Sequence, residues 1–149
     1  MRYCASVYGS ANRTTIAKLK KVFNFSARVI SGRRKYDHVS DVLNDLAWLR
    51  AHEVISYCDL SLMHGMLTFG KPDVLRSWIV YNHEHVRRDT RQSHHLTLPR
   101  VRNNHGKRRF VYRAAETYNQ MAIANGHSGL AMPLFKARIR ELLRARYDQ

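Results

Sequence analysis

Acidic residues are scarce in this sequence, and the scarcity is uneven. The 149 residues include 26 Lys and Arg but only 11 Asp and Glu, which gives a formal net charge of +15 at pH 7. No carboxylate precedes Asp37, although nine lysines and arginines do. Such an excess of one sign repels itself in a compact fold unless a polyanion neutralises it. The balance therefore favours nucleic acid as the partner, ahead of a membrane surface or an acidic protein.

Cysteines and long apolar runs are also few. Cys4 and Cys58 are the only cysteines, too few to imply a disulfide framework. No segment approaches the roughly 20 apolar residues of a membrane span, and the N-terminus lacks the apolar stretch of a secretory signal. We therefore expect an intracellular protein, nuclear or cytoplasmic, with no membrane partner.

Clustered carboxylates, which polymerases and nucleases use to hold two metal ions, are missing. No two acidic residues are adjacent, and no Tyr-x-Asp-Asp segment or Gly-rich phosphate loop occurs. Asp37, Asp41 and Asp45 share one side of a predicted helix, where helix caps and solubilising charges explain them better than a metal. We therefore expect no catalytic residue, no metal site and no cofactor in this chain.

Nine histidines raise an alternative from another functional class. The His83-Glu84-His85 triplet differs from the His-Glu-x-x-His arrangement, which places two histidines on one helical face. No cysteine pair lies near to complete a zinc site, so solvated loop histidines are the default interpretation. The alternative is a free-standing, metal-dependent nuclease that would need several of these side chains to converge on one ion: His83, Glu84, His85 or His94.

Apolar residues are spaced as in helices. Hydrophobic residues make up 44% of the chain, enough for a core. They recur at intervals of three and four over residues 14–30, and Gly32 stands where a helix C-cap is expected. We predict a mainly α fold, a bundle of five or six helices with at most a small β-hairpin near 96–110. The expected core includes Leu19, Phe23, Ile30, Leu43, Leu46, Trp48, Val54, Cys58 and Leu62.

The basic residues fall into zones that we expect to contact phosphate groups. The first zone lies on the helix predicted at 14–30 and on the turn after it; the second crowds around a predicted turn; a third basic segment spans 136–146. Tyrosines beside these residues, Tyr36 above all, are candidates for stacking on bases, as are Tyr81 and Tyr112. The nominated nucleic-acid-binding residues are Lys18, Lys21, Arg28, Arg33, Arg34, Lys35 and Tyr36 in the first zone, and Arg100, Arg102, Lys107, Arg108 and Arg109 in the second.

Several sequence boxes in the same order resemble one known family. Lys18–Gly32 (KLKKVFNFSARVISG) is similar to the segment that follows the palm in non-LTR, LINE-type retrotransposon reverse transcriptases of the jockey-like and chicken-repeat-like groups. The similarity continues through RKYDHVS (34–40), LAWL (46–49), TRQS (90–93), LPRVR (98–102), GKRRF (106–110) and AAETYN (114–119), and the terminal helix matches the family's ending. The resemblance therefore spans nearly the whole chain.

The resemblance implies a C-terminal fragment of an RNA-directed DNA polymerase that begins after the palm. Residues 1–80 would form a helical thumb-like region, 81–95 an exposed connection and 96–149 a basic C-terminal extension. Such a fragment would bind the RNA template and the DNA primer or target. The palm, fingers and endonuclease portions, with the Mg²⁺ of the polymerase, would belong to the parent polyprotein. A non-functional truncated retroelement product is the remaining alternative.

Overall fold

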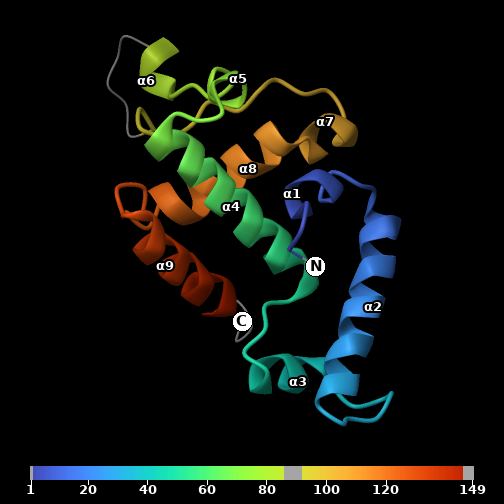
Figure 1. The fold of residues 1–149 in the computed structure, drawn as a ribbon. Coiled ribbons are helices and arrows are strands. Elements are labelled where there is room, and N and C mark those ends of the chain that lie inside the picture. Colours follow the sequence, from blue (N-terminus) through green and yellow to red (C-terminus); the bar gives the residue numbers. More distant parts are fainter. Residues whose placement is uncertain (1, 86–91, 146–149) are drawn as a thin grey trace.

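The computed structural model describes residues 2–85 and 92–145, and over them the chain is mainly α-helical, as predicted. Figure 1 shows the helices in chain order. More α-helices form in these residues than the five or six expected, because four are single turns of four or five residues. The elements are α1 (Ala5–Tyr8), α2 (Arg13–Ile30), α3 (Val39–Asp45), α4 (Ala51–Phe69), α5 (Asp73–Arg76), α6 (Asn82–His85), α7 (Asn104–Arg108), α8 (Phe110–Tyr118), the π-helical stretch η1 (Asn119–Ile123) and α9 (Met132–Ala145).

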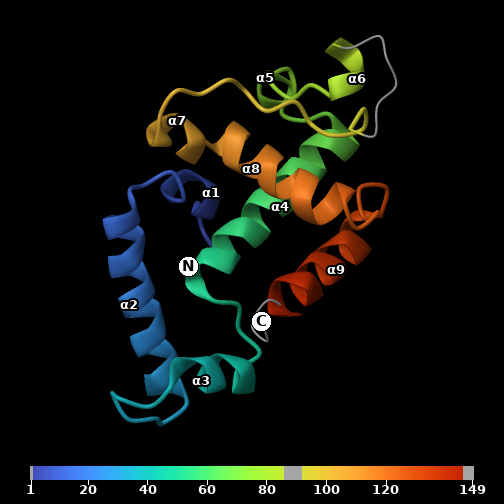
Figure 2. The same cartoon turned by 180° about the vertical axis from the view of Figure 1, so that it is seen from behind.

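The long helix α4 is the centre of the main core, with α8, η1 and α9 packed against it (Figures 1 and 2). Its residues Leu60, Met63 and Met66 are fully buried. Tyr118 of α8 and Phe135 of α9 fill the space opposite. Burying each such side chain contributes about 1.5–3 kcal/mol. The division into regions predicted at residue 80 stays a prediction. Helix α4, before residue 80, shares this core with α8 and α9, which come after it.

Helix α2 runs along one side of the molecule and packs against α3 at its C-terminal end (Figures 1 and 2). Ala27 of α2 is buried with Val42 and Leu43 of α3. The rings of Phe23 and Trp48 extend this contact, with centroids 5.3 Å apart. This second cluster is small, so much of the surface of α2 is left to solvent.

The predicted core residues are confirmed in part. Leu43 and Val54 are buried, and five others are half-buried: Leu19, Phe23, Leu46, Trp48 and Cys58. Two were wrong, because Ile30 is 61% and Leu62 is 39% exposed. Ile30 is the last residue of α2 and lies outside the α2–α3 cluster, while Leu62 is on the solvent side of α4.

The hairpin allowed for near residues 96–110 does not form. Leu96 instead makes an isolated antiparallel bridge with Tyr81. On its other edge the Asn119 side chain acts as the partner, since Leu96 N–H donates to Asn119 Oδ1 (2.8 Å) and Asn119 Nδ2 donates to the Leu96 carbonyl (2.9 Å). The expected turn is the start of α7, where Asn103 Oδ1 accepts the Gly106 N–H at 2.9 Å.

The described ends of the connection at 81–95 expose His83, Glu84, Gln92 and His94 but are tied to each other. Ser93 is buried, and its carbonyl accepts the His83 N–H at 3.0 Å. The Asn82 N–H donates to the His95 carbonyl at 2.9 Å, which ties the two ends together. Residues 86–91, with part of the box at 90–93, lie outside the described residues. Within the described residues, no helix is both long enough and apolar enough to span a membrane.

Candidate nucleic-acid interface

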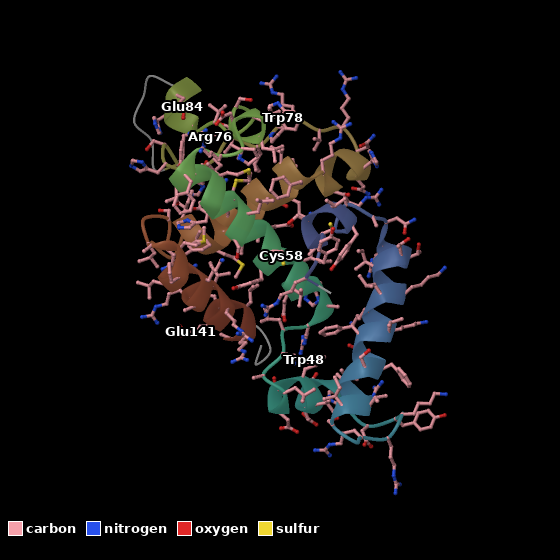
Figure 3. All side chains as sticks on the ribbon, in the orientation of Figure 1. Trp48, Cys58, Arg76, Trp78, Glu84 and Glu141 are labelled. Carbon is pink, nitrogen blue, oxygen red and sulfur yellow. The ribbon has the colours of Figure 1, made fainter. Side chains whose placement is uncertain are left out.

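The first basic zone is built on α2, which begins with a side-chain cap. Asn12 Oδ1 accepts the Thr15 N–H at 2.8 Å, and this bond satisfies one of the free amides at the helix start. Lys18 and Lys21 are exposed, and many side chains project from α2 away from the body of the molecule (Figure 3). Arg28 is half-buried and holds the following turn, because its Nε and Nη2 donate to the Asp37 carbonyl at 3.2 and 3.0 Å.

The turn after α2 presents the rest of this zone. Gly32 follows the helix with a φ of +66°, as the predicted C-cap requires. The carboxylate of Asp37 accepts the Arg34 N–H at 2.7 Å and fixes the turn from inside. Tyr36 is 89% exposed, with the Lys35 ammonium 5.5 Å from its ring centroid. The turn therefore offers solvent a free aromatic ring next to cations, which are Arg33, Arg34 and Lys35.

One nominated cation of this zone is paired. Arg33 Nη2 lies 3.5 Å from Asp45 Oδ2, and both side chains are more than half exposed. An exposed pair of this kind is worth about 0–1 kcal/mol. The pair therefore leaves Arg33 able to exchange Asp45 for a phosphate group.

The second basic zone is a compact segment that ends in α7. Gly106 lets α7 approach Val101 closely, since a Cβ at 106 would lie 2.8 Å from the Val101 Cβ. Arg108 is half-buried and its carbonyl accepts a hydrogen bond from Arg113. Among the described residues, its Nε has no hydrogen-bond partner. The other nominated cations of the zone are exposed: Arg100, Arg102, Lys107 and Arg109.

The basic turn of the first zone and the second zone lie at opposite ends of α2, while Lys18 and Lys21 lie in the first half of that helix. Figures 1 and 2 both show α7 near the start of α2 and the basic turn at its far end. Ser10, three residues before α2, lines the same surface groove as His105 and Arg109. Because α2 has 18 residues, the basic turn at 33–36 is separated from the second zone by the length of the helix, about 27 Å at 1.5 Å per residue. Together, α7, α2 and the basic turn place both zones along the side of the molecule that α2 forms (Figures 1 and 2).

The third basic segment has structural contacts as well. Arg140 and Arg144 of α9 both donate from Nη2 to the carbonyl of Ala47, in the connection between α3 and α4. Ala47 has a φ of +55°, in the left-handed region. These arginines therefore link α9 to the end of α3; Arg146 lies outside the described residues.

Arg113, which the sequence did not single out, is held by four side-chain hydrogen bonds. Its Nε and Nη2 donate to the two carboxylate oxygens of Asp59 at 2.6 and 3.2 Å. It also donates to the carbonyls of Arg108 (2.7 Å) and Ser6 (3.0 Å). Burial raises the pKa of Asp59 and outweighs the lowering effect of Arg113. This network joins α1, α4 and α8 and is structural.

The two other tyrosines considered for base stacking are engaged in packing. Tyr81 is half-buried against the main core and stacks on His83, with centroids 5.4 Å apart. Tyr112 is also half-buried, and its hydroxyl donates to Glu116 Oε1 at 3.5 Å. Of the three tyrosines, Tyr36 alone stands free on the surface.

The histidines do not form a metal centre in the part of the chain that the structure describes. The rings of His83 and His94 are 6.3 Å apart and tilted. His83 Nδ1 lies 3.1 Å from the Ser93 carbonyl, its hydrogen-bond partner. In residues 2–85 and 92–145, no three His, Cys, Asp or Glu side chains come together as possible ligands of an ion.

One histidine is a core residue, contrary to the expectation that the histidines lie in solvated loops. His64 is 1% exposed, and its ring stacks on Phe135 with centroids 3.8 Å apart. Its Nε2 lies 2.8 Å from the Leu130 carbonyl and its Nδ1 3.0 Å from the Tyr118 hydroxyl. A carbonyl can only accept, so Nε2 carries the proton and Nδ1 accepts from Tyr118. Burial lowers the pKa of His64 and raises that of Tyr118.

Comparison with known proteins identifies no relative: no family model, no curated protein and no solved structure matches this chain.

Proposed function

We propose that this chain binds the phosphate backbone of RNA and DNA through its two basic zones. The proposal rests on the solvent exposure of the nominated cations. Nine of the eleven nominated cations are exposed, and the other two, Arg28 and Arg108, are half-buried. Among the described residues, Arg33 is the only one of them whose side chain forms an ion pair. Exposed cations without carboxylate partners attract a polyanion and release its counterions on binding.

We further propose that the chain is the nucleic-acid-binding C-terminal portion of a retrotransposon RNA-directed DNA polymerase. The ordered series of sequence boxes supports this assignment, and so does the position of the basic zones within those boxes. The intact parent would carry out target-primed reverse transcription with Mg²⁺ held by other portions. This chain would contribute contacts to the backbone of the RNA template and the DNA primer, with no catalytic centre of its own.

If the exposed lysines of α2 contact phosphate groups, neutralising them should weaken the salt dependence of binding. In the double variant Lys18→Gln/Lys21→Gln, affinity for duplex DNA should fall, and the slope of log K against log salt should flatten by about 0.9 for each phosphate that the protein no longer neutralises. Fluorescence anisotropy with a labelled duplex, measured at several salt concentrations, gives both quantities. The lysines are exposed, so the variant should melt as the parent does.

The matched control is Arg2→Gln/Lys71→Gln, which removes the same charge from exposed cations outside all three basic zones. An equal change of slope in the two double variants would mean that net charge, and not the α2 surface, drives binding.

The retrotransposon assignment has its own test, because the genomic DNA just upstream should encode an in-frame Tyr-x-Asp-Asp segment. Its absence would reject the assignment and leave phosphate binding untouched.

A further inference from the structure

A surface groove lies between three segments that are distant in the sequence. It encloses about 580 Å³ and is lined by the end of the α1–α2 connection, by α5 with the residues after it, and by α7 and α8. Trp78, labelled beside α5 in Figure 3, is 59% exposed. The principal lining residues are Ser10, Leu75, Trp78, His105, Arg109 and Phe110.

The lining combines aromatic rings with positive charge. Trp78 and Phe110 supply the rings, and Arg109, exposed on the rim, supplies a guanidinium group. No carboxylate lines the groove among the described residues. The other exposed cations of the second basic zone precede Arg109 in the chain: Arg100 and Arg102 lie before α7, and Lys107 lies in it. An apolar peptide would pack against the rings but would not neutralise the cations. A second copy of this chain would add positive charge beside Arg109.

We propose that this groove binds single-stranded nucleic acid, with one unstacked base on the indole of Trp78 and the adjoining phosphate on Arg109. Base–aromatic stacking is open to every base, so the site is tolerant of sequence. In a duplex the bases already stack on one another and do not reach the indole. The inference deepens the proposed function and depends on it, since it assigns a single-stranded ligand to the groove beside the second basic zone.

The test compares two probes of the same length: a 12-nucleotide oligothymidylate and an abasic 12-mer that has the phosphates without the bases. Trp78→Ala should weaken oligothymidylate binding by about 5- to 140-fold, the range for one stacked base. It should leave binding of the abasic strand unchanged. Trp78→Phe, which keeps a ring, should restore part of the affinity.

Tryptophan fluorescence gives a second readout. Trp48 and Trp78 are the only tryptophans, so oligothymidylate should quench the parent more than Trp78→Phe, in which only Trp48 emits. Phe69→Ala is the matched control, because Phe69 is 65% exposed and does not line the groove; this variant should bind as the parent does.

The outcomes separate the two proposals. If the parent binds both strands but Trp78→Ala changes neither affinity, the groove does not hold a base and phosphate binding still stands. If the parent binds neither strand at low salt, phosphate binding fails and the groove proposal fails with it.

Discussion

At the scale of single residues, the structure separates arginines that hold the fold from arginines that face solvent. Arg113 directs its guanidinium group to Asp59 and two backbone carbonyls. Arg28 donates to the turn carbonyl of Asp37 from the surface of α2. Arg100 and Arg102 have exposed side chains. Sequence charge alone treats these arginines as equivalent, yet only the exposed ones are available to phosphate groups.

Asp59→Asn should destabilise the protein by about 3–5 kcal/mol, because it leaves the Arg113 charge buried without its counter-ion. Asp59 is 1% and the Arg113 side chain 19% exposed. Urea denaturation followed by circular dichroism measures the change. Glu141→Gln serves as the control, since it removes the exposed Arg138–Glu141 pair and should cost no more than about 1 kcal/mol. Equal effects of the two variants would contradict a structural role for the Arg113 network.

His64 should make stability depend on pH. Because burial holds its folded pKa below the usual value, the folded state takes up fewer protons than the unfolded state in acid. Its contribution is therefore fully present above the unfolded pKa of about 6.5 and declines as pH falls below it, by at most about 1.4 kcal/mol per pH unit. The protonated ring would place a second N–H against the Tyr118 hydroxyl.

The measurement is the free energy of unfolding at pH 7.5 and pH 5.5, for the parent and for His64→Gln. The variant does not titrate at this position, while all other groups are common to both proteins. The parent should lose more stability than the variant between the two pH values. Identical losses would show that His64 is not held neutral in the folded state.

At the scale of elements, apolar spacing predicted the long helices because each one buries a stripe along its length. The helix predicted at 14–30 is close to the bounds of α2. In α9, Phe135, Ile139 and Leu143 form such a buried stripe. The single-turn helices could not be predicted in this way, since four or five residues do not complete a periodic pattern.

The segment at 96–110 shows why local chemistry misled the prediction. Asn is favoured both in hairpin turns and at helix N-caps, because its side-chain oxygen accepts a nearby N–H in either setting. Asn103 makes that bond to Gly106 and begins a helix. Leu96 pairs instead with Tyr81 on one edge and with the Asn119 side chain, 23 residues away, on the other. A contact at that separation leaves no periodic trace in the sequence.

At the scale of the whole molecule, charge distribution nominated the two basic zones but not their arrangement. Only the fold places α7 near the start of α2 and the basic turn at its other end. The same packing brings Trp78, Phe110 and Ser10 to one groove. None of these three was nominated, because each looks like an ordinary packing or loop residue in isolation.

The arrangement predicts that one long duplex contacts both zones and a short one does not. The basic turn of the first zone and the second zone are separated by about 27 Å, the length of α2, which is the length of about 8 base pairs at 3.4 Å per pair. Arg100→Gln/Arg102→Gln/Lys107→Gln removes exposed cations from the second zone, and Arg34→Gln/Lys35→Gln removes them from the basic turn at the far end of α2. On a 20-base-pair duplex the two decreases in log K should add in the combined variant, because distant sites act independently.

The discriminating ligand is a hairpin with a six-base-pair stem, too short to span α2. Bound at one zone at a time, it should keep most of its affinity when a single zone is neutralised, since the other remains, and should bind weakly only in the combined variant. Anisotropy titrations at two salt concentrations measure these changes on RNA and on DNA. If the second-zone variant binds the long duplex as the parent does, that zone makes no contact with duplex, and its cations are left to serve the single-stranded groove beside Trp78.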